Sequence, residues 1–392
     1  MGEIPVKVLM VVESHAKETG GGPRYWAQLS DWLTRHGHQI IILSGVVEGS
    51  VFASPNTVGM VPVRRELRKL SYSTVTSRFA FMMRYIPVVR DFAMNWRPDI
   101  IHTVPPIASE AALRAGSRLD IPVLVSVLSH VEAQWFRVES NPLRAWFFRF
   151  LEARALHRPF SRIICLTQRS RRVLRAEGVP AERVVHIPHA VDVTRFNANA
   201  QPNFRKQLDF AKDTFVIGYA GALTREKGIN QLLQAMVQLS HHIDVHLLIA
   251  GEMPAGNQLK RLLEVKGLEN VSFLGPLEYD EMPSFMASLD LYVIPSFTET
   301  LPTTLLEALA TGTPVMATAV GGVREVLQPS FGIILTRPDT DQITKELKGL
   351  INNRAELQKM GRAGQRYVKM HHTWEQVGQL TEGVYRTCLQ TK

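Results

Sequence analysis

Residues 289–318 read LDLYVIPSFTETLPTTLLEALATGTPVMAT and hold the repeating unit of the predicted fold. An apolar run precedes an amphipathic helical pattern, and a second apolar run follows. A strand, a helix and a strand in this order are typical of a parallel sheet covered by helices. The same alternation recurs along the chain, in VKVLMVV, HQIIILSG, PDIIHTV, PVLVSVL, SRIICLT and RVVHIP, and then in TFVIGYAG, VHLLIAG, VSFLG, LDLYVIPS, TPVMAT and GIILT.

The two series of strands predict an α/β protein with two Rossmann-like, doubly wound parallel-sheet domains. A chain of 392 residues is also too long for one ordinary core. We expect an N-terminal domain over residues 1–190, a polar, proline-containing linker over 191–213, and a C-terminal domain over 214–370. Ligands bind beyond the carboxyl ends of such strands, so a cleft between two facing domains is the expected site.

The bulk composition indicates a soluble protein with a basic first half. Of the net charge of +9, residues 1–200 contribute 26 Lys and Arg against 16 Asp and Glu. This excess favours anionic partners, although a solvated arginine-rich surface explains it equally well. Two cysteines predict no disulfide framework and fit a reducing cytosol. The first residues do not resemble a signal peptide, and no apolar run is long enough to span a bilayer.

Two glycine-containing loops are candidates for binding an anion. Gly20, Gly21 and Gly22 precede Pro23, which suits the first position of a helix. In GYAGALTREKGIN, Gly221 is followed by Arg225 and Lys227, two cations that suit a diphosphate. Both stretches could equally be ordinary solvated loops, and neither matches a nicotinamide-dinucleotide or P-loop motif.

The opening stretch also places two carboxylates around a helix start. Thr304 as N-cap and Glu307 three residues later would form a capping box, which is the structural alternative to a ligand role for Glu307. That leaves Glu299 on the preceding loop without a structural role. Two carboxylates at the end of a strand could accept hydrogen bonds from two polyols, a ribose and a sugar ring.

Taken together, these segments resemble the retaining, nucleotide-sugar-dependent glycosyltransferases of the GT-B fold, specifically family 4, the group 1 type. The likeness covers nearly the whole chain and includes an E-x7-E pattern at Glu299 and Glu307. The resemblance implies that a last helix over 371–392 packs back on the N-terminal domain. The segments that carry it are SRIICLTQRSRRVLRAEGVPAERVVHIPHAVDVTRF, GALTREKGINQLLQAM, VHLLIAGEMPAGNQLKRLL, VSFLGPLEYDEMPSFMASLDLYVIPS and ETLPTTLLEALATGTPVMATAVGGVREVL.

The resemblance also implies a role for each matching residue. Glu307 would bind the ribose of the donor, Glu299 the hydroxyls of the transferred sugar, and Lys227 the diphosphate. Arg225 would compensate for Ala222, which stands where the family usually has arginine. His130 is either a sugar contact or an incidental loop residue. The other residues expected around the donor are Gly21, Gly22, Gly221, Gly251, Glu252, Thr300, Leu301, Pro302 and Thr303.

The expected activity is transfer of a hexosyl group from a nucleoside diphosphate sugar to an acceptor hydroxyl, with retention and without a metal or other cofactor. The single Asp-x-Asp, Asp339 and Asp341, is expected to cap a helix instead of holding a metal. The alternatives are a nucleotide-sugar epimerase, a glycan phosphorylase or a non-catalytic protein of the same fold.

The expected acceptor is a glycan or a lipid-linked molecule bound by the N-terminal domain. Residues 64–85 and 141–162 mix arginines with aromatic residues at helical spacing. Each could lie on the anionic inner face of a membrane, or be a core helix with a basic solvated face. Without a recognition motif, a nucleic-acid partner is not expected.

Overall fold

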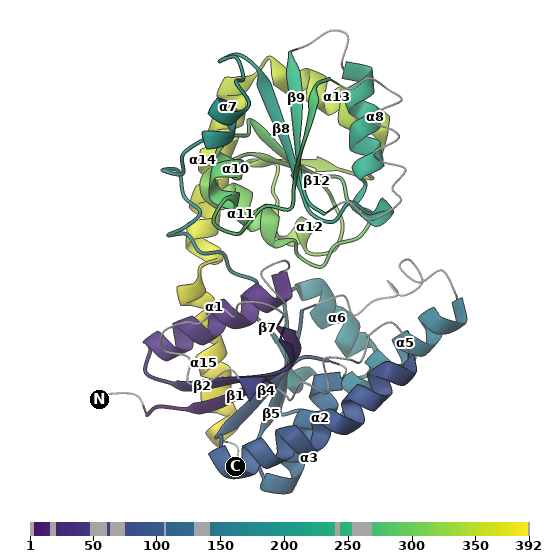
Figure 1. Cartoon of the computed structure of the whole chain (residues 1–392), viewed down its shortest axis with the longest axis vertical. Helices are drawn as coiled ribbons and strands as arrows, with labels where there is room; N and C mark the ends of the chain where they lie inside the picture. The colour runs from purple at the N-terminus through teal and green to yellow at the C-terminus, as the bar shows by residue number, and fades with distance from the viewer. Residues whose placement is uncertain are drawn as a thin grey trace. The chain divides into compact units, whose positions relative to one another are not determined.

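The computed structural model describes residues 4–15, 21–47, 61–62, 75–105, 107–128, 142–239, 244–252 and 269–390. The chain divides into two compact units (Figure 1). Unit 1 is Met1–His189 together with Trp374–Lys392, and unit 2 is Ala190–Thr373.

In unit 1, the described strands form a parallel sheet in the order β3-β2-β1-β4-β5-β6-β7. Its strands are β1 Lys7–His15, β2 Gln39–Val47, β3 Val61–Pro62, β4 Ile100–Thr103, β5 Val123–Val127, β6 Arg162–Cys165 and β7 Val184–His186. The helices described with them are α1 Gly21–Arg35, α2 Val75–Trp96, α3 Ile107–Leu119, α5 Pro142–Leu156, α6 Gln168–Ala176, the 3-10 turn η2 Ala181–Arg183 and α15 Trp374–Gln390.

In unit 2, the described strands form a second parallel sheet in the order β10-β9-β8-β11-β12-β13. Its strands are β8 Phe215–Ala220, β9 Val245–Ala250, β10 Val271–Gly275, β11 Leu291–Ile294, β12 Val315–Thr318 and β13 Gly332–Leu335. Its helices are α7 Asn203–Gln207, the 3-10 turn η3 Arg225–Lys227, α8 Ile229–Leu239, α10 Met282–Ala287, α11 Thr303–Thr311, α12 Val323–Val326, α13 Thr340–Ile351 and α14 Arg354–His371.

The sheet of unit 2 is apolar on both faces, as the continuous apolar runs of the sequence predict. Successive side chains of a strand point to opposite faces. Leu291 and Val293 therefore join one buried cluster with α8 and α13, while Tyr292 and Ile294 join the other with α10 and α11. The predicted α/β class, the parallel sheets and all twelve predicted strands are confirmed.

The short edge strand β3 is the described strand that the sequence analysis did not predict. It pairs two residues, Val61 and Pro62, with β2. A pair this short leaves no period-2 pattern in the sequence.

Residues 191–213, expected to be a linker, belong to unit 2 in the structure. Phe196 and Phe204 are 0% and 7% exposed and lie in the core beside α10. Val191, near the first residue of unit 2, forms a parallel bridge with Thr373, its last residue. The stretch was predicted to be a linker because most of its residues are polar, although Phe196 and Phe204 pack it against the core.

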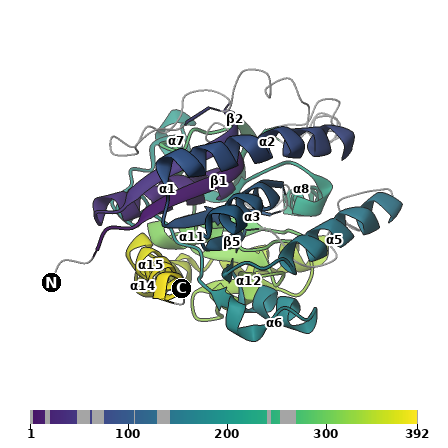
Figure 2. The same ribbon diagram turned by 90° about the horizontal axis from the view of Figure 1, so that it is seen from below.

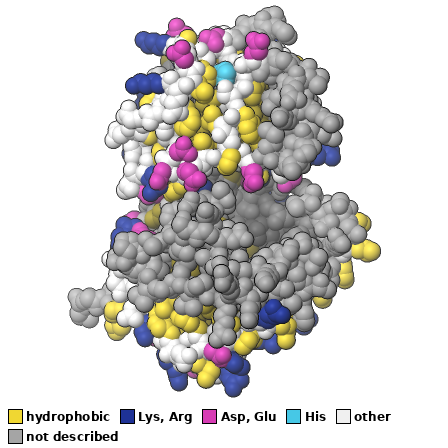
Figure 3. Space-filling view, in the orientation of Figure 1, with side chains coloured by type: hydrophobic (Ala, Val, Ile, Leu, Met, Phe, Trp, Pro, Cys, Tyr) yellow, Lys and Arg dark blue, Asp and Glu magenta, His cyan; other side chains and the backbone are white. Residues whose placement is uncertain are grey.

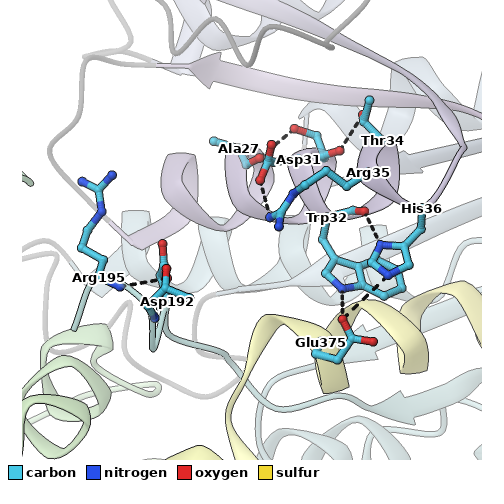
Figure 4. A network of polar contacts seen from close by, with 11 residues as sticks. Ala27, Asp31, Trp32, Thr34, Arg35, His36, Asp192, Arg195 and Glu375 are labelled. Atoms are coloured by element: carbon cyan, nitrogen blue, oxygen red, sulfur yellow. Dashed lines mark hydrogen bonds and ion pairs between the residues drawn. The ribbon is translucent and has the colours of Figure 1, made fainter. Parts of the chain in front are cut away.

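Helix α15 is part of unit 1, although it follows unit 2 in the sequence. Figure 4 shows Glu375 of α15 accepting a hydrogen bond from the indole N–H of Trp32 on α1, at 2.8 Å. Further along α15, a side chain in place of Gly378 would meet the Trp32 ring, since its Cβ would lie 2.1 Å from the ring atom Cδ2. The absence of a side chain at Gly378 thus lets α1 and α15 pack closely.

The buried end of α15 contacts the sheet through a histidine. His102 on β4 hydrogen-bonds Tyr385 of α15 through Nδ1 and Ser126 of β5 through Nε2, both at 2.7 Å. His102 is 0% exposed, and burial lowers its pKa from 6.5 to about 3. The neutral imidazole therefore connects the last helix to two strands near neutral pH.

Candidate active site

The candidate site of unit 2 lies where the order of its strands reverses. Strand β8 pairs with β9 on one side and with β11 on the other. In doubly wound sheets, the loops that leave such a pair of strands diverge and open a crevice at their carboxyl ends. Lys227 follows β8 and Glu299 follows β11, so the topology brings the two predicted residues to this crevice.

Two glycines allow the loops after β8 and β9 to pass very close together. Gly221 and Gly251 have φ angles of +152° and +153°, and a Cβ on Gly251 would lie 2.0 Å from the carbonyl oxygen of Gly221. Only glycine fits this backbone approach. Glu252, the next residue, is exposed.

The turn that carries the cations is locked against the loop after β11. Gly228 ends η3 in the left-handed region at φ +70°, and a Cβ there would lie 1.7 Å from the carbonyl oxygen of Pro295. The backbone N–H of Phe297 donates to the carbonyl of Glu226 at 2.8 Å. These contacts fix Lys227 opposite the loop of Glu299.

Lys227 and Glu299 form an ion pair, with 2.7 Å between Nζ and Oε1. Ser296 donates its hydroxyl to the same Oε1, also at 2.7 Å. The Glu299 side chain is 10% exposed, and that of Lys227 is 30% exposed. Arg225 lies on the same turn and is exposed. The sequence analysis missed Ser296, for which the signal was a serine two residues after the strand.

The start of α11 differs from the predicted capping box. The helix begins at Thr303 with Pro302 in the N-cap position, and no side chain caps it. The prediction of Thr304 as N-cap and Glu307 as its partner is therefore wrong, because Pro302 already provides the extended backbone that precedes a helix. Leu301 anchors the loop in the core at 7% exposure.

Glu307 lies on the buried side of α11, at 3% exposure. It lies near the Tyr292 hydroxyl, which donates to the carbonyl oxygen of Ala220 at 2.9 Å. Burial raises the pKa of Tyr292, and the charges of Glu307 and Glu299 raise it further. Tyr292 therefore remains a neutral donor that holds β11 to the end of β8.

A further glycine turn, at Gly321 and Gly322, contacts the backbone of Glu299 and Thr300. Gly321 has φ +53°, and a Cβ there would lie 1.8 Å from the carbonyl oxygen of Glu299. The backbone N–H of Gly322 donates to the carbonyl of Thr300. Glu299 and Thr300 are thus held by contacts with two other turns, that of Lys227 and that of Gly321, and such support positions a binding site precisely.

The remaining candidates lie elsewhere or outside the described residues. Gly21 and Gly22 form the first turn of α1 in unit 1, so the helix begins two residues before Pro23, where it was predicted to begin. Their backbone N–H groups belong to the first turn, which has no partners within the helix. His130 lies outside the described residues.

The Asp-x-Asp sequence caps a helix, as predicted. Asp339 is the N-cap of α13 and accepts from the backbone N–H of Gln342 at 3.0 Å. Asp341 accepts from Gln238 at 3.2 Å. Within the described part of the chain, no group of three His, Cys, Asp or Glu side chains is arranged to hold a metal.

Two family models match the two halves of the chain. A family model described as glycosyl transferases group 1 matches residues 200–367, and one described as Glycosyltransferase Family 4 matches residues 19–195. A GDP-mannose-dependent monoacylated alpha-(1-6)-phosphatidylinositol monomannoside mannosyltransferase from Corynebacterium glutamicum is 34% identical over 205 residues. That match covers 50% of this chain and only 54% of the relative.

Solved structures with the same architecture cover nearly the whole chain. Sucrose-phosphate synthase from Thermosynechococcus elongatus superposes with a TM-score of 0.81 at 21% identity, over 98% of this chain and 100% of that one. Anabaena HepE, solved in complex with UDP and glucose, has a TM-score of 0.77 at 18% identity, over 96% and 98%. The two sheets and these neighbours define the two-domain GT-B fold. The two halves of the chain thus match models of two glycosyltransferase families, and together with the fold they support a glycosyltransferase of the group 1 type.

Proposed function

We propose that this glycosyltransferase moves a hexosyl group from a nucleoside diphosphate sugar to an acceptor hydroxyl, with retention of anomeric configuration. The observation that carries the proposal is the Lys227–Glu299 ion pair, which lies at the crevice of unit 2 just before the N-terminus of α11. The cation and the helix N-terminus match the negative charge of a diphosphate, and the carboxylate can accept hydrogen bonds from the hydroxyls of the sugar.

The ion pair explains how one site serves two parts of the donor. An incoming diphosphate competes with Glu299 for the Lys227 ammonium group. Glu299 then keeps the hydrogen bond from Ser296 and has acceptor positions available for sugar hydroxyls. Glu307, eight residues further along, accepts from the ribose.

The proposed displacement occurs on one face of the sugar. The bond between the anomeric carbon and the diphosphate oxygen breaks as the acceptor oxygen bonds to that carbon, and the departing phosphate takes the acceptor's proton. Lys227, Arg225 and backbone N–H groups neutralise the charge that grows on the leaving group, so the residues proposed here need no metal. Glu299 is already paired with a cation, which suits binding better than nucleophilic attack.

We propose classes of donor and acceptor from what the names of related proteins say. The relative from Corynebacterium glutamicum is named for GDP-mannose and a phosphatidylinositol mannoside, and the HepE crystal contains UDP and glucose. We therefore place GDP- and UDP-sugars first among donors, and a lipid-linked or glycan hydroxyl first among acceptors. Such a donor and acceptor would be met at the cytoplasmic face of a membrane.

The experiment is product analysis of the purified full-length chain with UDP-, GDP- and ADP-sugars, with and without lipid-linked and glycan acceptors. The expected products are a glycosylated acceptor and free nucleoside diphosphate, with the anomeric configuration of the donor, and an unchanged rate in EDTA. Glu299→Ala serves as the inactive control. A rearranged nucleotide sugar would instead indicate an epimerase, a sugar phosphate released from a glycan would indicate a phosphorylase, and no turnover with any pair would support a non-catalytic protein.

A further inference from the structure

Helix α5 of unit 1 carries a stripe of large apolar side chains that are exposed. Leu143, Trp146 and Phe150 are 78%, 60% and 48% exposed. Their spacing of three and then four residues places them on one face of the helix. The rings of Trp146 and Phe150 stack with 5.7 Å between centroids and 11° between planes. Figure 3 shows hydrophobic atoms, in yellow, at the projecting end of this helix.

The sequence around this stripe is rich in positive charge. Residues 142–176, from the start of α5 to the end of α6, contain nine arginines and a single acidic residue, Glu152. Arg154 is exposed at the end of the apolar stripe, and Arg172 and Arg175 are exposed on α6. Both ribbon views show α6 beside α5 (Figures 1 and 2).

We infer that α5 and α6 form a surface that docks on an anionic lipid bilayer, with Trp146, Phe150 and Leu143 entering the headgroup boundary. Aromatic side chains prefer this boundary, and arginines beside them attract anionic lipid headgroups. The surface lies in unit 1 and does not depend on the donor chemistry proposed for unit 2.

The size of the stripe favours a bilayer over a protein partner. Three side chains of these types supply on the order of 400 Å², whereas a stable protein complex buries about 800 Å² on each partner. A bilayer does not require a matching surface, because lipids rearrange around each inserted side chain. Among the described residues no helix is long and apolar enough to cross a membrane, and docking of this kind requires none.

The test measures sedimentation of the full-length chain with vesicles of phosphatidylcholine mixed with phosphatidylglycerol, and with vesicles of phosphatidylcholine alone. We expect binding to the anionic vesicles that weakens with added salt, and at least about tenfold weaker binding to the neutral ones. Trp146→Ser combined with Phe150→Ser should reduce binding to the anionic vesicles roughly tenfold or more. Leu380→Ser is the matched control, because Leu380 is 50% exposed on α15 of the same unit.

The charges are tested separately from the apolar side chains. Arg172→Glu should weaken binding to anionic vesicles several-fold, while Arg118→Glu, an exposed position on α3, should not. Lipids brominated near the headgroup should quench tryptophan fluorescence, and less so in Trp146→Phe. The inference is overturned if the chain does not sediment with anionic vesicles, or if the double variant binds them as tightly as Leu380→Ser does. It is also overturned if the unmodified chain is a dimer and the double variant is a monomer, which would indicate a protein interface. Thermal unfolding checks that each variant is folded.

Discussion

At the scale of single residues, the structure explains the predicted pattern of charges in the crevice of unit 2. Glu299 and Lys227 are 72 residues apart in sequence, yet their side-chain atoms lie 2.7 Å apart. Their residue types and positions after a strand predicted both as ligands of a sugar diphosphate, and this role stays a prediction. Their pairing was not predictable, because it depends on the contact between Gly228 and Pro295, which no local pattern records.

The first prediction concerns the two glutamates. Glu299→Ala should abolish glycosyl transfer and leave nucleotide binding intact, because this side chain is proposed to contact the sugar alone. Glu307→Ala should weaken binding of the nucleoside diphosphate, which calorimetric titration measures. Unchanged turnover and affinity in both variants would reject the site.

A second prediction concerns Lys227. Lys227→Met removes the cation proposed to stabilise the leaving diphosphate, and should lower kcat by roughly 100-fold or more. Lys345→Met on α13 is the control, because Lys345 is an exposed lysine of the same unit. A steady-state assay that finds both variants equally active would show that Lys227 does not act on the donor.

Ser296 allows a sharper test of positioning. Its hydroxyl donates to Glu299 Oε1, so Ser296→Ala should lower kcat several-fold with little effect on nucleotide affinity, while Ser296→Thr should retain more of the activity. A loss of nucleotide affinity equal to that of kcat would indicate a general structural role instead. Turnover and calorimetry on the three proteins distinguish the two results.

At the scale of elements, the loops of unit 2 depend on glycines that ordinary sequence patterns mark only as turns. Gly228 and Gly321 permit backbone approaches of less than 2 Å from a hypothetical Cβ to a carbonyl oxygen. The elements themselves were predictable because their apolar runs are long and bounded. The start of α11 was not, because Thr304 and Glu307 satisfy a capping-box pattern that Pro302 overrides.

The Gly228→Ala variant tests this support. Its methyl group would meet the Pro295 carbonyl in a left-handed conformation, so we expect a loss of about 2 kcal/mol or more of the unfolding free energy. Weaker diphosphate binding should accompany it. In the control Gly349→Ala, the new methyl group meets nothing within 4 Å on α13, and stability should rise by up to about 1 kcal/mol. Chemical denaturation measures both, and equal stabilities would contradict the close packing.

At the scale of the whole molecule, the sequence predicted two α/β domains, and the family resemblance implied a last helix that returns to the first of them. The structure groups the chain into two units, with α15 in unit 1. The contacts that place α15 are specific: Glu375 with Trp32, and Tyr385 with His102. Neither could be predicted from periodicity, because the partners are more than 280 residues apart.

The buried His102 predicts how stability depends on pH. Its pKa is about 3 in the folded chain against 6.5 in the reference state, so below pH 6.5 the unfolded chain binds a proton that the folded chain does not. The stability that the neutral ring contributes is complete above pH 6.5 and is lost as pH falls toward 3, by up to ~1.4 kcal/mol per pH unit.

Urea unfolding between pH 5 and 7 should therefore show a smaller acid loss of stability in His102→Gln than in the unmodified chain. The exposed His371→Gln is the control and should keep the original slope. Equal slopes in His102→Gln and the unmodified chain would show that His102 is not held neutral.

The bridge between Val191 and Thr373 has a consequence for protein engineering. The backbone N–H of Val191 also donates to His372 at 2.9 Å, so the polypeptide enters and leaves unit 2 at one spot. Unit 2 is therefore organised as an insertion whose ends meet, and such modules can be excised or transplanted without breaking their own fold. Unit 1 cannot be separated in the same way. A chain cut after His189 would lose α15, which carries Tyr385, and would leave His102 without its partner on that helix.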